Sequence, residues 1–309
     1  MANSKPKKTV KKSSEKPEVK EAKQTVAAAP ATASSTHEPV MKGFWARKCD
    51  KNENVLTIFK SPRIWGALLG ELIGTMLIMM LFLLLGLTQP IYIILALIGV
   101  YIAVVSLSGA NLNPLITAGM MATRRMSAIR GILYMLAQVL GAWLGLIIVN
   151  AFRLGSEAVA ELPVMGEVTG ETFWAVAFVE LLGAMVIAFC FARSLKYARK
   201  SPMTFAITVT SGITLAVLLG IFLANGYFGF TSNAFMFNPA AALMYQILPT
   251  TADTFGELAG LAGLAISAYV LIPMVGGILG FWISDLAGRL SDGGYVCDDV
   301  VREDGHCQA

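Results

Sequence analysis

The chain has 309 residues, of which 56% are hydrophobic and only 14% are charged, and its mean hydropathy is +0.65. Because a soluble domain carries about 25% charged residues, this composition excludes an ordinary soluble enzyme and predicts a polytopic membrane protein. The charge is also divided unevenly: residues 1–60 carry 13 of the 24 Lys and Arg residues and have a local net charge of +7, whereas the rest of the chain has a net charge of −3.

Residues that build metal centres and nucleophilic active sites are scarce. The two histidines, His37 and His306, lie near the ends of the chain, and the four cysteines form no Cys-x-x-Cys pair. The sequence has no glycine-rich phosphate loop of the Walker type, which argues against an ATP-driven pump. We therefore expect no metal ion, no cofactor and no catalytic residue.

The chain opens with a lysine-rich stretch, residues 1–43, that continues into Ala, Pro, Ser and Thr. This composition predicts a disordered basic tail on the cytoplasmic side. The tail lacks the interleaved aromatic residues of a nucleic-acid-binding segment, so we expect no nucleic-acid partner and only weak attraction to anionic lipid. Residues 44–60 mix bulky apolar side chains with Arg and Lys, which is typical of a segment that lies along the membrane interface.

Six apolar runs follow, each close to the ~20 residues that a membrane-spanning helix needs. We expect the spans at Ile64–Gly86, Ile91–Leu107, Ile129–Phe152, Thr172–Ser194, Pro202–Ala224 and Ala262–Leu286. Lys and Arg gather in the connections after the second and fourth spans, whereas the other connections carry almost none. The positive-inside rule therefore predicts that both termini are cytoplasmic, with residues 291–309 as a C-terminal tail.

Two acidic residues, Glu71 and Glu180, fall deep inside the first and fourth predicted spans. A charge costs free energy in hydrocarbon, so each carboxylate should face the interior of the helix bundle and accept hydrogen bonds there. Their surroundings match, because each Glu is followed directly by Leu and, three residues later, by Gly74 or Gly183. The two spans therefore look like copies of one element.

The match extends along both halves of the chain. Asn113-Pro114-Leu115 in the first half corresponds to Asn238-Pro239-Ala240 in the second. Since each half contains three spans, the two copies must enter the membrane with opposite orientation, which makes an inverted repeat. The predicted membrane domain covers residues 61–290, with one repeat at about 61–155 and the other at about 170–290.

Each Asn-Pro pair lies in a connection that is too apolar for an ordinary loop. Asn is a good helix N-cap and Pro is favoured at the first helical position, so each connection is predicted to contain a short helix that starts at the Pro. Two half-helices that enter from opposite faces would meet with their N-termini near the middle of the membrane. There, the amides of Asn113 and Asn238 would offer hydrogen-bond donors to a neutral molecule, and the helix dipoles would repel cations. The expected fold class is all-α transmembrane, with six spanning helices and two half-helices.

These motifs resemble those of the major intrinsic protein family, the aquaporins and glycerol facilitators, over roughly residues 61–290. The matching elements are Glu71-x-x-Gly74-Thr75, Ser108-Gly109-Ala110-x-x-Asn113-Pro114, Ala137-Gln138-x-Leu140-Gly141-Ala142, Glu180, Asn238-Pro239-Ala240, and Pro273 followed by Gly276. The resemblance implies an aquaporin-like fold and a passive plasma-membrane channel for water or small neutral solutes such as glycerol, assembled as a homotetramer with one pore per subunit. It also implies that Glu71 and Glu180 brace the half-helix loops and that the pore centre consists of Asn113, Pro114, Leu115, Asn238, Pro239 and Ala240.

The sequence departs from the family pattern at three positions. Leu115 replaces an Ala, Asn111 replaces a His, and Ala241 replaces the Arg of the outer selectivity filter. By the same resemblance, two further filter positions fall on Ile93 and Phe235, and the member from the fifth span lies near Ile213–Leu215. The filter is therefore expected to consist of Ile93, Thr214 at the centre of that range, Phe235 and Ala241. Such a ring carries no fixed charge, which predicts a wider and less polar filter than that of a strict water channel and favours glycerol-like solutes.

Two other functions stay open at this point. Inverted repeats with broken helices also build secondary transporters, in which flux saturates and depends on an ion gradient. A family member that transports little and serves adhesion or packing is the second alternative, because the filter Arg is missing.

Overall fold

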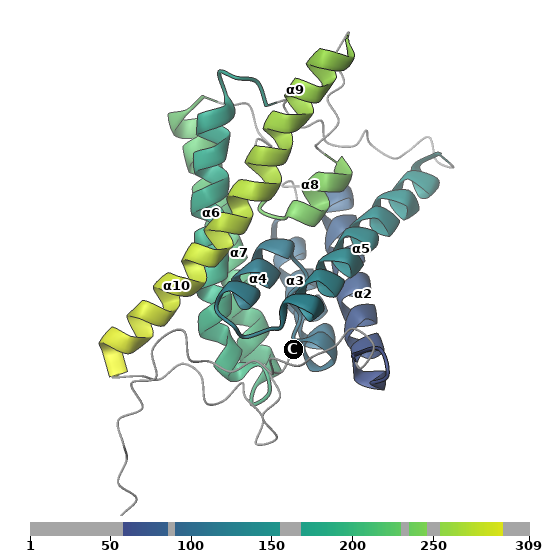
Figure 1. The fold of residues 1–309 in the computed structure, drawn as a ribbon, viewed down its shortest axis with the longest axis vertical. Helices are drawn as coiled ribbons and strands as arrows, with labels where there is room; N and C mark the ends of the chain where they lie inside the picture. Colours follow the sequence, from purple (N-terminus) through teal and green to yellow (C-terminus); the bar gives the residue numbers. More distant parts are fainter. Residues whose placement is uncertain (1–57, 86–89, 155–167, 230–234, 246–253, 293–309) are drawn as a thin grey trace, which may run out of the picture. The chain divides into compact units, whose positions relative to one another are not determined.

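The computed structural model describes residues 58–85, 90–154, 168–229, 235–245 and 254–292, which all belong to one compact unit, Lys42–Ala309. Within these ranges the regular structure is entirely helical (Figure 1). The predicted N-terminal tail and most of the predicted interfacial segment and C-terminal tail lie outside the described residues.

The helices follow the order that the sequence predicts. They are α2 (Pro62–Leu85), α3 (Pro90–Ser108), α4 (Pro114–Ala122), α5 (Ala128–Leu154), α6 (Phe173–Ser194), η2 (Leu195–Tyr197), α7 (Pro202–Ile221), η3 (Phe222–Tyr227), α8 (Pro239–Tyr245), α9 (Phe255–Ile266), η4 (Ser267–Leu271) and α10 (Ile272–Asp292). In the part of the chain that the structure describes, six segments are long and apolar enough to cross a membrane: Pro62–Leu85, Pro90–Ser108, Ala128–Phe152, Phe173–Tyr197, Pro202–Tyr227 and Ala259–Leu290. The all-α transmembrane fold class is confirmed.

The last spanning segment begins earlier than the predicted start at Ala262. Its first helix, α9, starts at Phe255, where the side chain of Thr254 accepts a hydrogen bond from the backbone N–H of Glu257 at 3.2 Å. Thr followed three residues later by Glu is a helix-start signal that the hydropathy pattern does not reveal. The segment then winds as a π-helix through η4, which ends two residues before Pro273. Proline has no N–H to donate to the preceding turn.

The spanning helices surround the two half-helices. Neighbouring helices follow the order α5, α2, α3, α7, α6, α10 around the bundle. Half-helix α4 packs against α10 and α5, and α8 packs against α5 and the η4 turn. Figure 1 shows α4 and α8 one above the other, between α5 and the long rod made by α9 and α10.

Two close helix crossings depend on glycine. A Cβ atom on Gly141 of α5 would collide with the carbonyl oxygen of Leu72 on α2, and one on Gly276 of α10 would lie only 2.6 Å from the carbonyl oxygen of Leu181 on α6. Residues without a side chain let the backbones approach this closely. The two leucines directly follow the two buried glutamates, so the crossings are equivalent in the two halves of the inverted repeat.

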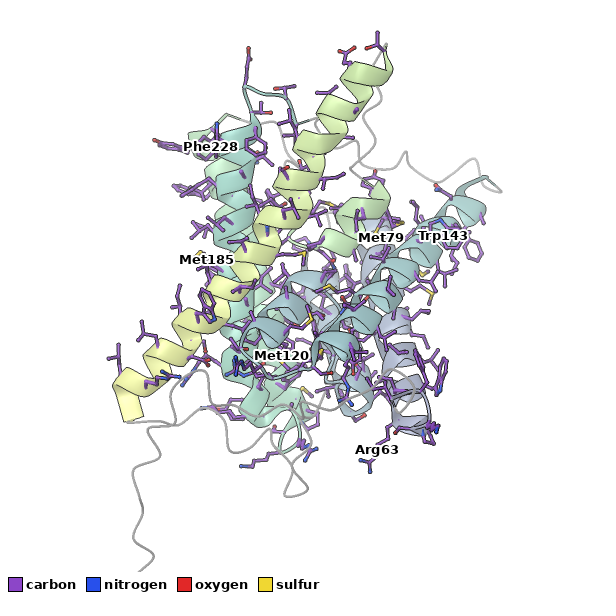
Figure 2. All side chains as sticks on the ribbon, viewed as in Figure 1. Arg63, Met79, Met120, Trp143, Met185 and Phe228 are labelled. Carbon is purple, nitrogen blue, oxygen red and sulfur yellow. The ribbon has the colours of Figure 1, made fainter. Side chains whose placement is uncertain are left out.

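Large apolar side chains also cover the outside of the bundle. Trp143 on α5, Trp174 at the start of α6 and Phe222 on η3 are 47%, 76% and 68% exposed, and Figure 2 shows Trp143 pointing away from the helices. Such an exterior suits hydrocarbon rather than water.

A buried ion pair ties the end of half-helix α4 to α10. The guanidinium of Arg125 lies 2.7 Å from the carboxylate of Asp285, and both side chains are almost fully buried. Arg125 also donates to the hydroxyl of Thr123 at 3.1 Å and lies 5.3 Å above the ring of Phe281. These contacts hold the short helix against a spanning helix, since α4 is too short to be stable alone.

We expect Gly141→Val to destabilise the fold, because its side chain would push α2 and α5 apart, and overpacking of this kind costs about 1–3 kcal/mol. The measurement is thermal unfolding in detergent, followed by tryptophan fluorescence and size-exclusion chromatography. Gly99→Val is the matched control, because nothing lies within 4 Å of a Cβ atom on Gly99. Equal melting temperatures for the two variants would contradict the role of Gly141.

We expect Asp285→Leu to lower the stability by about 3–5 kcal/mol, because it leaves the charge of Arg125 buried without its partner. The double variant Arg125→Met/Asp285→Leu removes both charges and should recover most of the loss. Melting temperatures of the three proteins in the same detergent measure both effects. A double variant no more stable than Asp285→Leu alone would show that the ion pair is not the cause.

Candidate pore

The two Asn-Pro motifs start the two half-helices, as the sequence predicts. Asn113 caps α4, with extended backbone angles (φ −158°, ψ 126°) and its side-chain oxygen accepting from the N–H of Leu115 at 3.1 Å. Asn238 caps α8 in the same way and accepts from the N–H of Ala240 at 3.0 Å. In both cases Pro is the first helical residue, where its missing N–H costs nothing.

The amides of the two asparagines reach across to the opposite repeat. Asn113 Nδ2 donates to the carbonyl oxygen of Phe237 at 2.7 Å, and Asn238 Nδ2 donates to the carbonyl oxygen of Leu112 at 3.4 Å. The two half-helices therefore meet at their N-termini. Each asparagine remains 8% exposed, so these amides are not completely sealed off from small molecules.

The first loop is held by the carboxylate of Glu71. It accepts hydrogen bonds from the backbone N–H groups of Asn111 at 3.0 Å and Leu112 at 2.7 Å, and from the hydroxyl of Ser108 at 2.5 Å. The side-chain amide of Gln138 on α5 donates to it as well, at 2.7 Å. This buried carboxylate, 0% exposed, thus satisfies loop donors that have no helical partner.

The second loop is held in the same manner by the carboxylate of Glu180, which is also fully buried. It accepts from the backbone N–H groups of Met236 and Phe237, the latter at 3.1 Å. The residue before each Asn has left-handed backbone geometry, with φ of 54° at Leu112 and 50° at Phe237. Such a conformation costs a non-glycine residue of order 1–3 kcal/mol, which the carboxylate hydrogen bonds offset.

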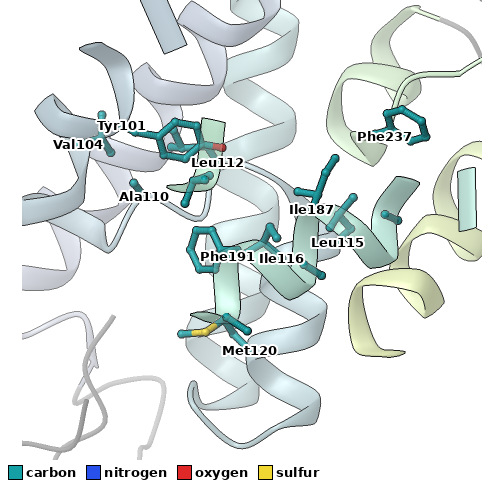
Figure 3. Close-up of a cluster of buried hydrophobic side chains, with 14 of the residues drawn as sticks. Tyr101, Val104, Ala110, Leu112, Leu115, Ile116, Met120, Ile187, Phe191 and Phe237 are labelled. Atoms are coloured by element: carbon teal, nitrogen blue, oxygen red, sulfur yellow. The ribbon is translucent and has the colours of Figure 1, made fainter. Parts of the chain in front are cut away.

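Apolar side chains fill the space around the loops. Leu112 and Leu115 are fully buried, and Ile116 is 1% exposed. Figure 3 shows these three side chains in one cluster with Ile187 and Phe191 of α6. The side chain of Leu115, which is larger than the Ala of the family pattern, is thus accommodated within this apolar cluster.

The structure does not bring the four predicted filter residues into one cluster. Ile93 of α3 is half-buried against the large apolar cluster that includes Phe235, whereas Ala241 is buried in a different cluster. Thr214 lies in a groove of about 330 Å³ between α3 and α7 and donates to the carbonyl oxygen of Thr210 at 2.9 Å. The groove is lined by Ile94, Ile98, Ile207, Thr210, Ser211, Thr214, Leu215 and Leu218.

A different residue of α7 lies against Phe235. A Cβ atom on Gly220 would be 3.0 Å from the Cζ atom of Phe235. On α7 it is therefore Gly220 that lies next to Phe235. Hydropathy could not separate the two, because it does not fix the rotation of a helix that is apolar on all sides.

Several residues around the site had no assigned role in the sequence analysis. Tyr134 donates from its hydroxyl to the carbonyl oxygen of Ser108 at 3.0 Å, and Gln138 donates to the hydroxyl of Thr117 at 3.0 Å. Tyr269 is fully buried and lies at the equivalent position of the second repeat. An alignment of the two repeats residue by residue would have revealed that Tyr134 and Tyr269 are equivalent.

We expect Glu71→Ala to lower the melting temperature, because it leaves the loop N–H groups of Asn111 and Leu112 unpaired, at about 1–3 kcal/mol for each buried donor. Glu71→Gln keeps one acceptor oxygen and should lie between wild type and Glu71→Ala. Thermal unfolding in detergent measures the order. The exposed Glu171 provides the control variant Glu171→Ala, and a Glu71→Ala protein as stable as this control would refute the bracing role.

Comparison with known proteins agrees with this architecture. The model of the Major intrinsic protein family matches residues 58–284. A curated relative, "Probable aquaporin PIP2-5" of Arabidopsis thaliana, is 40% identical over 47 residues, which is 15% of this chain and 16% of the plant protein. The match to this relative therefore spans about a sixth of its length. Because the family match covers most of the chain, including five of the six spanning segments completely and most of the sixth, this multi-pass membrane protein belongs to the major intrinsic protein family.

Proposed function

We propose that the protein is a passive channel through which water and small uncharged solutes such as glycerol cross the membrane, with the two Asn-Pro motifs at its centre. Members of the family are membrane channels for water or small solutes rather than enzymes. The observation that supports this proposal best is the pair of reciprocal hydrogen bonds from Asn113 and Asn238 to the opposite loops.

These two hydrogen bonds leave one N–H group of each asparagine amide available to a solute. A side-chain amide has two N–H donors, and each asparagine uses one of them on a carbonyl oxygen of the opposite repeat. Among the described residues, no second acceptor engages either amide. A passing oxygen atom can accept from both, whereas a cation meets N–H groups and the positive ends of helix dipoles.

The selectivity filter of the proposed channel is uncharged. Its members would be Ile93, Phe235, Ala241 and, on α7, Gly220 in place of Thr214. Without a guanidinium, solutes pass an apolar wall before they reach the asparagines. This favours small neutral solutes over ions, whose desolvation the filter does not offset.

The assembly and orientation are part of the same proposal. Lys and Arg lie at the start of α2, around the end of α4, after α6 and at the end of α10, on alternate ends of successive spans, which supports cytoplasmic termini. We propose a homotetramer in the plasma membrane. The groove between α3 and α7 is a candidate subunit contact, because the buried hydroxyl of Thr210 finds no partner among the described residues. Ser and Thr hydroxyls often hydrogen-bond across membrane helices.

The deciding experiment is stopped-flow light scattering on proteoliposomes that contain the full chain, with water, glycerol and urea as solutes. A channel gives flux that rises linearly with solute concentration and does not depend on a pH gradient. Saturating flux driven by a proton gradient would instead indicate a secondary transporter. Permeability equal to that of empty liposomes would indicate a structural role.

We expect Asn238→Asp to lower solute permeability and to admit cations, because it keeps the capping oxygen but replaces the N–H donors with a negative charge. The measurements are solute flux in liposomes and sodium conductance in planar bilayers. Asn150→Asp, near the end of α5, is the control for the added charge. Conductance that stays at the level of this control would argue against a central role of Asn238 in cation exclusion.

A further inference from the structure

We propose that the connection between α6 and α7 is a binding surface for phospholipids whose headgroup carries a phosphate monoester. This surface, the basic connection, consists of residues 193–200 and carries four cationic side chains, those of Arg193, Lys196, Arg199 and Lys200. Four or more Lys and Arg residues directly next to a membrane-spanning helix are typical of segments that bind anionic lipid. The inference goes beyond the proposed channel function and does not depend on it.

The basic connection is held in one conformation by its apolar side chains and its backbone. Leu195, Tyr197 and Ala198 are partly buried and pack against the large apolar cluster of the bundle. The N–H of Ala198 donates to the carbonyl oxygen of Leu195 at 3.1 Å, and the N–H of Ser201 donates to that of Tyr197 at 2.8 Å. A ligand therefore meets a preformed surface, so that little binding free energy is spent on ordering a loop.

The cationic side chains lie on the outer side of the basic connection. Lys196, Arg199 and Lys200 are exposed, and Arg193 is half-buried. Three of the four cations are spaced three residues apart, along the last turn of α6, the 3₁₀ turn η2 and the turn that follows. Side chains at this spacing nearly eclipse each other on a 3₁₀ turn, so these cations lie near one side. The ammonium group of Lys196 also lies over the ring of Tyr197, 5.0 Å from its centroid.

The charges of this surface are not spent inside the protein. Arg193, Lys196 and Arg199 form no ion pair with any residue that the structure describes. The connection between α4 and α5 is also basic but differs, because its Arg125 is buried and paired with Asp285 at 2.7 Å. The basic connection therefore presents its positive charge to an anionic ligand from outside.

The types of cation indicate the chemistry of that ligand. A guanidinium can donate two parallel hydrogen bonds to a phosphate group, and an ammonium group adds a compact point charge. A phosphate monoester carries about −1.5 to −2 charges near neutral pH, whereas a phosphodiester carries one. Two Arg and two Lys residues on one short connection therefore match a monoester better than the single charge of a diester.

An exposed apolar side chain lies directly beside these cations. Helix α7 begins at Pro202, and Met203 in its first turn is 54% exposed. A phospholipid can thus place its phosphate on the basic connection and an acyl chain against the start of α7. A soluble phosphate compound gains only the first of these contacts, so we expect the lipid to bind more tightly than its free headgroup.

The test is the affinity of the full chain, in a neutral detergent, for dioctanoyl phosphatidylinositol 4,5-bisphosphate, measured by isothermal titration calorimetry. Each cation near an anionic lipid contributes about fivefold to binding, so Lys196→Gln/Arg199→Gln should bind about 30-fold more weakly than wild type. The matched control is Lys60→Gln/Arg63→Gln, which removes two exposed cations at the start of α2 (Arg63 in Figure 2). It should keep the wild-type affinity. The lysine-rich N-terminal stretch is the same in all three proteins.

Size-exclusion chromatography checks that each variant is folded, and Lys196→Gln alone, with an expected loss of about fivefold, serves if the double variant is not. A folded double variant that binds as tightly as wild type, or an equal loss in the control, would overturn the surface. Equal affinity for dioctanoyl phosphatidylserine would overturn the preference for a monoester. Equal affinity for free inositol 1,4,5-trisphosphate would overturn the contact with the lipid chain. Solute flux is not part of the readout, so this result is separate from the test of the channel.

Discussion

The structure depends on two buried carboxylates that hold strained loops inside the membrane. Between a spanning helix and a half-helix the backbone must turn at a depth where no water can satisfy its N–H groups, and an unpaired group there costs several kcal/mol. Glu71 and Glu180 each accept from two consecutive N–H groups of such a loop. Once these bonds are made, Leu112 and Phe237 can adopt left-handed geometry, and the asparagines that follow are aimed at each other.

The rest of the fold brings the two loops to the same place. Glycine at the crossings of α2 with α5 and of α6 with α10 lets α2 and α6, the helices that bear the two glutamates, approach their neighbours closely. The Arg125–Asp285 pair holds the far end of α4 against α10. Half-helix α4 is thus fixed at both ends. The hydrogen bonds from one repeat to the other then follow from geometry, because the repeats have opposite orientation.

The sequence predicts those parts of the site that occur twice. A single Asn-Pro motif or a single buried glutamate would not indicate a functional site. Because each occurs at equivalent positions of the two repeats, the sequence indicates that they belong to one shared site. The pairing of Arg125 with Asp285 could not be predicted, because it has no counterpart in the other half and joins residues far apart in the chain. The residue of α7 that lies against Phe235 could not be predicted, since a helix that is apolar on all sides has no hydrophobic period from which its rotation can be read.

The two halves differ most in what surrounds their carboxylates. Glu71 is enclosed by polar partners, with Ser108 and Gln138 donating directly and Tyr134 holding the carbonyl of Ser108. The equivalent of Gln138 is Pro273, which cannot donate, and the second loop carries stacked aromatic rings in place of a polar network. A polar network fixes a loop in one arrangement through directed hydrogen bonds, whereas ring packing against glycine fixes a loop through complementary shape. The two repeats therefore hold equivalent loops by different interactions, the first by hydrogen bonds around Glu71 and the second by aromatic packing beside Glu180.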